Sequence, residues 1–177
     1  MNPLLIIGGA LALLALMGGK KRGNTATIDN AELYNAFDRL KARYGADFAR
    51  KIERLFRLET AHFKSGQFKE SLSAGMEGVD GKDRFPFGWS SLQSFVDAHP
   101  ELGSASDYFL VPMKDNHTGK ERMFVGFPNV ESSVLFTGYV VDKRGGDPGS
   151  WHSTDPNRKA EYNRRLQSVR TDIVDSL

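Results

Sequence analysis

The sequence feature that most constrains the fold is an apolar stripe at helical spacing between residues 46 and 76. Apolar side chains recur there every three to four positions, at Phe48, Ile52, Leu55, Phe56 and Phe63. This spacing is typical of the face that an α-helix turns toward a hydrophobic core. The stripe therefore predicts a helix packed against the interior of a folded domain.

One acidic residue, Glu59, falls on this stripe, three residues after Phe56. The neighbouring charged residues are predicted to reach water from other faces of the helix: Glu53, Arg54 and Arg57. Burial disfavours the charged form of a carboxyl group and raises its pKa, so that it can hold a proton near neutral pH. Glu59 is therefore a candidate general acid, and a helix-end carboxylate bonded to a neighbouring turn is the other interpretation.

The composition excludes several classes of site. The chain has 177 residues, enough for one compact domain with an appendage. A net charge of +2 does not require nucleic acid, and it suits an anionic glycan or a membrane surface equally well. There is no cysteine, which excludes disulfides and thiolate ligands, and the four histidines have no ligand spacing. We expect no metal, no cofactor and no specific nucleic-acid partner.

The N-terminal segment is an uncharged, almost wholly apolar run from Pro3 to Met17, followed by Lys20, Lys21 and Arg22. At ~1.5 Å per residue this run is at the short end of what crosses a bilayer. A cleaved signal peptide carries its positive charge before the apolar run, not after it. Residues 1–19 are therefore predicted to form an uncleaved single-pass membrane anchor, whereas a buried core helix would not be apolar on all sides.

The three basic residues also predict an orientation. Positive charges tend to stay on the cytoplasmic side of a membrane, which would place the following domain there as well. A virion with an internal membrane is one setting consistent with this, and a bacterial cell envelope is the other. Residues 20–30 are predicted to be a basic flank and linker, and residues 31–177 the folded domain.

Helix signals continue along the domain. Asp29 or Asn30 can cap a first helix that ends at Gly45. The helix with Glu59 is predicted to end at Ser65-Gly66, which would place the carboxyl group near a helix C-terminus, where the helix dipole raises its pKa further. A short helix is predicted for residues 90–99, after a long loop at 75–88 that ends in aromatic residues.

The C-terminal half begins with two predicted strands, residues 108–112 and 123–127, joined by turn residues into a β-hairpin. Asn129 can cap a helix over residues 130–142, and Pro156 opens a last helix. The buried stripe of that helix is Tyr162, Leu166, Val169 and Ile173, and its basic residues are predicted to form a solvated face: Arg158, Lys159, Arg164, Arg165 and Arg170. The predicted fold class is mainly α (α+β), a helical domain with one small hairpin.

Five local patterns follow one another between about residues 29 and 177. They are Leu58-Glu59-Thr60; Ser65-Gly66-Gln67; Phe85-Pro86-Phe87-Gly88-Trp89; the strand from Met123 to Phe127 before Ser132 to Tyr139; and Trp151, Thr154-Asp155-Pro156 and Tyr162 to Leu166. In this order they resemble the lysozyme-like glucosaminidase family, which includes flagellar peptidoglycan hydrolases and autolysins. The resemblance implies a lysozyme-like helical fold.

The resemblance also implies roles for single residues. Glu59 would be the general acid that protonates the glycosidic oxygen of the peptidoglycan glycan strand; lysozyme is itself the type case of such an acid. Tyr139 would lie in the cleft and orient the substrate or the attacking water, with a plain core aromatic as the alternative. Three aromatic residues would bind sugar: Phe87, Trp89 and Trp151.

The chain departs from the family at the second carboxylate. The family often takes a base or nucleophile from the first hairpin strand, and Tyr108 to Pro112 contain no acid. The candidates are Asp115 and Glu121, with Asp107, Asp80 and Asp83 as further options. If none serves, Glu59 could act first as acid and then as base on the sugar's own 6-hydroxyl, as in a lytic transglycosylase. The implied enzyme is therefore an N-acetylglucosaminidase or muramidase, or a lytic transglycosylase.

These expectations give two functions of different classes. The first is a membrane-anchored muralytic enzyme, most simply a bacteriophage virion protein that opens the cell wall during entry. Its partners would be peptidoglycan glycan strands, a lipid membrane through residues 3–17, and other virion proteins. The second is a catalytically inactive domain of the same fold that tethers a membrane to a capsid or envelope.

Overall fold

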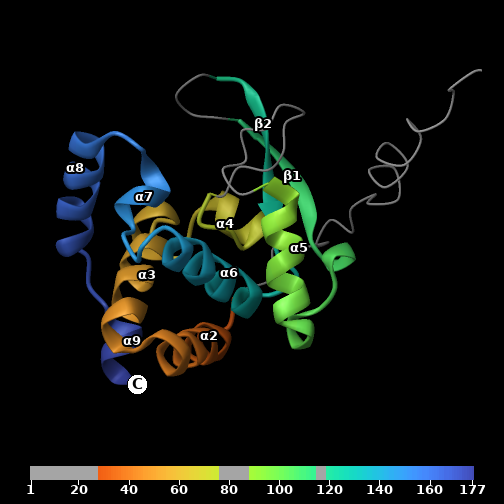
Figure 1. Cartoon of the computed structure of the whole chain (residues 1–177), viewed down its shortest axis with the longest axis horizontal. Helices are drawn as coiled ribbons and strands as arrows, with labels where there is room; N and C mark the ends of the chain where they lie inside the picture. The colour runs from red at the N-terminus through yellow and green to blue at the C-terminus, as the bar shows by residue number, and fades with distance from the viewer. Residues whose placement is uncertain (1–27, 76–87, 115–118) are drawn as a thin grey trace, which may run out of the picture.

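The computed structural model describes residues 28–75, 88–114 and 119–177, with the side chains of 88–91 left out. It is mainly helical with a small two-stranded antiparallel sheet (Figure 1). The elements in chain order are α2 (Asn30–Tyr44), α3 (Ala46–Glu59), α4 (Gly66–Ser71), α5 (Gly88–Ala98), β1 (Phe109–Lys114), β2 (Glu121–Gly126), α6 (Val130–Lys143), α7 (Gly149–His152), α8 (Pro156–Gln167) and α9 (Asp172–Ser176).

The predicted helix starts are confirmed by their caps. The side chain of Asp29 accepts a hydrogen bond from the backbone N–H of Ala31 at 3.0 Å, at the start of α2. Asn129 accepts from Ser132 at the start of α6 (2.8 Å). Asp155 does the same for Arg158 at the start of α8. Each cap satisfies one of the N–H groups that the first turn of a helix leaves without a partner.

Helix α6 forms the centre of the domain (Figure 1), and ten of its 14 residues are buried. Helix α2 crosses it closely at Gly138, where an added Cβ would lie 2.5 Å from Cδ1 of Leu40. A larger residue there would push the two helices apart. Glycine therefore sets the distance between α2 and α6.

The helix with Glu59 ends earlier than predicted. It stops at Glu59 itself, so Phe63 lies in the following turn and not on the helix. The side chain of Thr60 ends the helix, because its hydroxyl donates to the carbonyl of Phe56 at 2.5 Å and accepts from the N–H of Phe63 at 2.9 Å. Phe63 still reaches the core, where its ring stacks on Phe56 and contacts Phe68. The serine–glycine pair predicted to end this helix instead begins a short one, α4.

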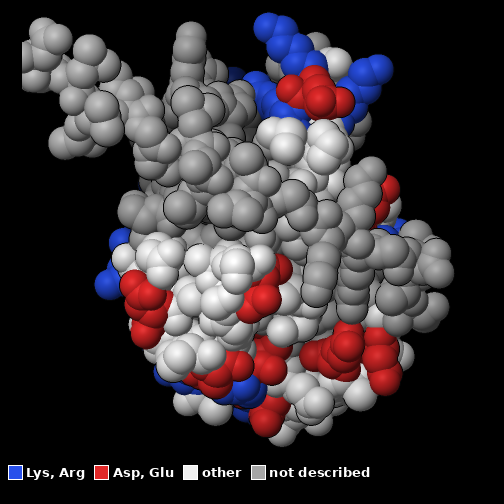
Figure 2. Space-filling view, turned by 90° about the vertical axis from the view of Figure 1, so that its right-hand side faces the viewer, with Lys and Arg blue, Asp and Glu red and all other residues white. Residues whose placement is uncertain are grey.

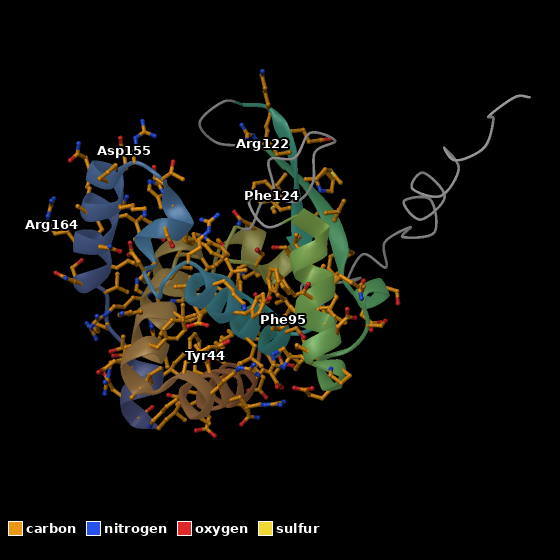
Figure 3. The ribbon with its side chains drawn as sticks, viewed as in Figure 1. Tyr44, Phe95, Arg122, Phe124, Asp155 and Arg164 are labelled. Carbon is orange, nitrogen blue, oxygen red and sulfur yellow. The ribbon has the colours of Figure 1, made fainter. Side chains whose placement is uncertain are left out.

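The predicted hairpin is confirmed. Strands β1 and β2 are antiparallel, with Val111 opposite Phe124 and Leu110 opposite Val125. Its base is fixed to α4, because the N–H of Phe127 donates to the carbonyl of Ser71 at 2.9 Å. The end of the hairpin that carries Arg122 projects from the rest of the domain (Figure 3).

The predicted last helix is divided in two. Helix α8 ends at Gln167, and a separate short helix, α9, follows from Asp172. Tyr162 and Leu166 are buried on α8, and Ile173 is buried on α9. Three of the four residues of the predicted stripe are thus buried, whereas Val169 is half-buried between the two helices. The apolar period did not indicate the break between the helices.

The predicted membrane anchor, Pro3 to Met17, lies outside the described residues. Among the residues that the structure does describe, no helix is both long enough and apolar enough to cross a bilayer.

Candidate active site

Glu59 is the last residue of α3 and is half-buried. The prediction that it lies near a helix C-terminus is confirmed, whereas the apolar stripe predicted a more enclosed side chain. The carboxyl group faces α8, and this placement gives it one specific partner.

That partner is Tyr162, whose hydroxyl donates a hydrogen bond to Oε1 of Glu59 at 2.6 Å. Tyr162 is 2% exposed. Burial raises the pKa of its hydroxyl well above the usual range, and the negative charge of Glu59 and the hydrogen bond raise it further. Tyr162 therefore keeps its proton at physiological pH and remains a donor.

The sequence placed Tyr162 on a buried stripe but did not predict this bond. A signal was present, because a buried tyrosine usually needs a partner for its hydroxyl, whereas a phenylalanine or leucine does not. The sequence alone could not choose the partner, since 103 residues separate Tyr162 from Glu59.

A third side chain covers Tyr162. The imidazole of His152, on α7, stacks on the phenol ring with 4.7 Å between the ring centroids and 5° between the planes. His152 is exposed on its other side. Trp151, the adjacent residue of the same short helix, is half-buried against the core. The structure thus brings Trp151 to the same part of the domain as Glu59, through α7 and α8.

A second carboxyl group on α3, that of Glu53, has the burial expected of Glu59. Glu53 was predicted to reach water, but its side chain is 0% exposed. It accepts hydrogen bonds from the backbone N–H groups of Ile173 (3.0 Å) and Val174 (2.8 Å), and it pairs with Arg57 at 2.7 Å. Both of its oxygens are occupied by these contacts. Glu53 therefore has a structural role, which leaves Glu59 as the accessible glutamate of this helix.

A strained turn follows Glu59 directly. Three consecutive residues, Ala61, His62 and Phe63, have φ of 48°, 58° and 65°, the left-handed region. For residues other than glycine this region costs about 1–2 kcal/mol each. The turn is held by Thr60, whose carbonyl accepts from the N–H groups of both Lys64 and Ser65 at 2.9 Å. Such strain often occurs beside functional residues.

Tyr139 does not contact Glu59 in this structure. Its half-buried ring packs against the rings of Phe95 and Phe136, whose centroids lie 5.6 Å and 6.4 Å from that of Tyr139. The Nζ atom of Lys143 lies 5.5 Å from the centroid of the Tyr139 ring. These contacts are those of an aromatic residue at the edge of the core.

The neighbours of Tyr139, which belongs to α6, show which end of α3 it lies beside. The adjacent residue, Gly138, packs against Phe48 in the first turn of α3. Phe48 and Glu59 are 11 residues apart on one helix, about 17 Å at 1.5 Å per residue. Phe95, which contacts Tyr139, and Tyr44, which contacts Phe48, are labelled in Figure 3. Tyr139 therefore lies by the opposite end of α3 from the candidate acid.

Glu121 is exposed at the start of β2, opposite Lys114. It is six residues from Phe127 at the base of the hairpin, about 20 Å along an extended strand. Lysine and arginine surround an acidic group at the projecting end of the molecule, at the top of Figure 2. Within the described part of the chain, nothing brings Glu121 to Glu59.

The other candidate acids and sugar-binding residues give less information. Asp107 caps its own turn, with Oδ2 accepting from the N–H of Ser104 at 2.7 Å. Asp115 and Phe87 lie outside the described residues, as do Asp80 and Asp83. Trp89 lies in the first turn of α5, where only the backbone is described.

Among residues 28–75, 88–114 and 119–177, no group of three or more histidine or acidic side chains is placed to hold a metal ion. The chemistry that the described site offers is therefore that of one carboxyl group and its tyrosine donor. A carboxyl group fixed at one oxygen can exchange a proton through the other.

Comparison with known proteins finds no family model, no curated protein and no solved structure that matches this chain.

Proposed function

We propose that this protein is a membrane-anchored peptidoglycan-degrading glycosidase of lysozyme-like fold in which Glu59 is the general acid. The observation that carries the proposal is the 2.6 Å hydrogen bond from the buried Tyr162 to Oε1 of Glu59. Acid catalysis needs a carboxyl group held in one orientation beside the bond to be cleaved. Tyr162 supplies that orientation.

The proposed chemistry gives the two carboxyl oxygens of Glu59 different roles. Oε1 is held by Tyr162, and Oε2 has no hydrogen bond to any described residue. Oε2 would carry the proton and donate it to the glycosidic oxygen as the bond breaks. The carboxylate that remains would be stabilised by the Tyr162 hydroxyl, and a donor aimed at a charge that develops during the reaction lowers the barrier.

The second half of the reaction has two routes. In hydrolysis, water attacks with help from a second carboxylate, for which Asp115, Asp80 and Asp83 are the remaining candidates. In a lytic transglycosylase, Glu59 takes back a proton from the sugar's 6-hydroxyl, which closes an anhydro ring. The separation of Glu59 from Glu121 favours the second route.

Substrate contacts in this proposal come from aromatic side chains. Trp151 lies in the helix that also carries His152, and it would stack on a sugar ring, together with Phe87 and Trp89. Tyr139 would contact the substrate at a distance from the acid. The setting is a membrane-bound virion protein or an envelope enzyme, with peptidoglycan as substrate and virion proteins as further partners.

A structural tether of the same fold is the second candidate. The observation in its favour is that, within the described residues, no second acid lies beside Glu59, so the bond to Tyr162 could serve only to join α3 to α8. The tether reading predicts no turnover on any wall type.

The test is clearing of purified peptidoglycan suspensions by the full chain in an uncharged detergent. Glu59→Gln should lower the rate by about 10²–10⁴-fold, the usual contribution of a general acid. Glu70→Gln, which changes an exposed carboxylate on α4, is the matched control and should leave the rate unchanged.

Mass spectrometry of the fragments then separates the two routes, because hydrolysis leaves a reducing sugar and transglycosylation leaves an anhydro sugar. A wild-type protein that clears no wall type would overturn the enzyme proposal in favour of the tether.

A further inference from the structure

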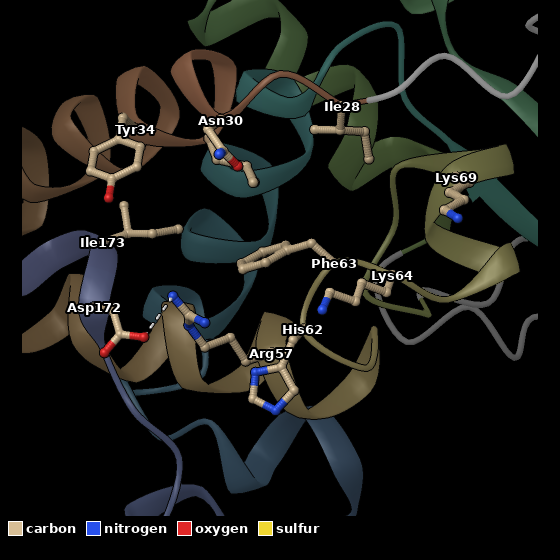
Figure 4. Close-up of a pocket in the computed structure, with 11 residues that line it drawn as sticks. Ile28, Asn30, Tyr34, Arg57, His62, Phe63, Lys64, Lys69, Asp172 and Ile173 are labelled. Carbon is tan, nitrogen blue, oxygen red and sulfur yellow. Dashed lines mark ion pairs between the residues drawn. The ribbon is translucent and has the colours of Figure 1, made fainter.

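A second site lies on the other side of α3 from Glu59. It is a pocket of about 590 Å³ between the start of α2, the end of α3, the strained turn, α4 and α9 (Figure 4). Arg57 lines it, two residues before Glu59 on the same helix, and two residues correspond to about 200° around an α-helix. The pocket and the candidate acid therefore lie on opposite sides of α3.

The pocket is positively charged. Its lining includes Arg57, Lys64, Lys69 and His62 and one acid, Asp172. Arg57 is largely neutralised, since it pairs with the buried Glu53 at 2.7 Å and lies 3.8 Å from Asp172. The two lysines are exposed and make no ion pair within the described part of the chain. Their charges remain available for an anionic ligand.

The opposite wall of the pocket is apolar. Ile28, Leu33, Tyr34, Phe63 and Ile173 line it, and in Figure 4 the Phe63 ring lies between the cationic side chains and the start of α2. A ligand that matches both walls has an anionic group and an attached apolar part. The left-handed turn places His62 and Phe63 in the lining of the pocket at a cost in backbone strain.

The position of the pocket on the chain indicates the source of such a ligand. Ile28, at its edge, is the first residue that the structure describes. The proposed anchor ends at Met17, so ten residues connect the two, and ten residues span at most about 35 Å. The pocket is thus held close to the membrane that the anchor would enter. Residues 20–22 are basic and would be repelled by the pocket, which argues against this segment as its occupant.

We propose that this pocket binds the headgroup of an anionic phospholipid. The phosphate would contact Lys64 and Lys69, and the upper acyl chain or glycerol would contact Phe63 and Ile173. The proposal rests on the membrane anchor of the proposed function but not on the wall-cleaving activity. It has a geometric consequence, because a domain seated on the membrane through this pocket turns Glu59 away from the bilayer.

The test uses the full chain in micelles of an uncharged detergent, titrated with short-chain phosphatidylglycerol that mixes into the micelles. Binding is followed by the amide NMR signals of residues 61–69 and 172–173. A basic residue near an anionic membrane surface contributes about fivefold to the affinity, so the double variant Lys64→Gln/Lys69→Gln should weaken binding about 30-fold.

The matched control is Arg158→Gln/Arg164→Gln. It removes the same charge from the outer surface of α8, where Arg164 points away from the domain (Figure 3), and should leave the affinity unchanged. An equal loss in both variants would mean general attraction by net charge and would overturn the proposal. So would the absence of signal changes at residues 61–69 in the wild-type protein.

A second arm separates a lipid from a free phosphate. Glycerol phosphate should shift the same signals only at much higher concentration, because it lacks the apolar part. Equal affinity for glycerol phosphate would overturn the lipid source. Peptidoglycan clearing by the lysine variant in detergent should match the wild-type rate, so that failure of this proposal and failure of the enzyme proposal give different results.

Discussion

At the scale of single residues, the hydrogen bond between Tyr162 and Glu59 joins two side chains whose roles require different burial. The tyrosine must stay protonated in order to donate, and its burial secures this. The carboxyl group must stay accessible in order to transfer a proton, and it is half-buried. Glu53, six residues earlier, shows the alternative, a fully buried carboxylate with every acceptor occupied.

Tyr162→Phe removes the donor and keeps the ring that stacks on His152. We expect peptidoglycan clearing to fall about 10²-fold, as for the loss of one donor to a developing charge. Tyr44→Phe, at the far end of the domain (Figure 3), should leave the clearing rate unchanged. An undiminished rate in Tyr162→Phe would show that Glu59 needs no positioning by α8.

The same variant has a readout that does not depend on activity. In the unfolded chain a tyrosine loses its proton near pH 10, whereas the raised pKa of Tyr162 keeps it protonated in the folded protein. Above pH 10 the folded state therefore binds one more proton than the unfolded state, and the free energy of unfolding falls by up to about 1.4 kcal/mol per pH unit. Tyr162→Phe should lose this contribution, which urea unfolding at a series of pH values would show.

At the scale of elements, helix starts were more predictable from local sequence than helix ends. Asp29, one of two predicted caps, and Asn129 cap the helices that the sequence assigned to them. Asp155 caps the helix that Pro156 was predicted to open. Such starts are predictable because a cap is a contact between residues two or three positions apart. The end of α3 was not predictable in this way. Phe63 continues the apolar period of the helix, yet it reaches the core from a left-handed turn.

Ala61→Gly tests the strain in that turn. Ala61 is exposed with φ of 48°, and glycine adopts this conformation without the steric cost of a Cβ. We expect the free energy of unfolding to rise by up to about 1 kcal/mol.

The matched control for this prediction is Ala160→Gly, at an exposed position inside α8. The same substitution there should lower the free energy of unfolding by about 1 kcal/mol. A decrease of equal size in both variants would contradict the assignment of strain to the turn.

At the scale of the whole molecule, the C-terminal helix is held by a residue from the middle of α3. Glu53 accepts from the N–H groups of Ile173 and Val174, at the start of α9, and its ion pair with Arg57 compensates the buried charge. Arg57 in turn lines the pocket on the opposite side from Glu59. One helix, α3, thus contributes to the core, the candidate acid, the pocket and the attachment of the chain end.

Glu53→Gln should lower the free energy of unfolding by about 3 kcal/mol, because it removes the buried carboxylate that neutralises the charge of Arg57. Urea unfolding measures this, and Glu70→Gln should change it by less than about 0.5 kcal/mol. Hydrogen exchange at the amides of Ile173 and Val174 should also become faster. Unchanged exchange at these amides would mean that core packing alone holds α9 in place.

The sequence by itself determined the helical character of the domain, the hairpin, the helix starts and most of the apolar positions of the core. These follow from side-chain period and from contacts between near neighbours, which do not depend on the rest of the fold. It also singled out Glu59, since a carboxyl group on an apolar stripe is unusual whatever surrounds it.

Only the tertiary structure decided which carboxyl group of α3 is buried and which partner each one has. Glu53 and Glu59 are both glutamates of one helix, and their environments differ because α9 covers one and α8 meets the other. The separation of Tyr139 from Glu59 and the cationic pocket behind Arg57 depend equally on residues far apart in the chain. Contacts of this kind are set by the packing of whole helices, which local sequence does not encode.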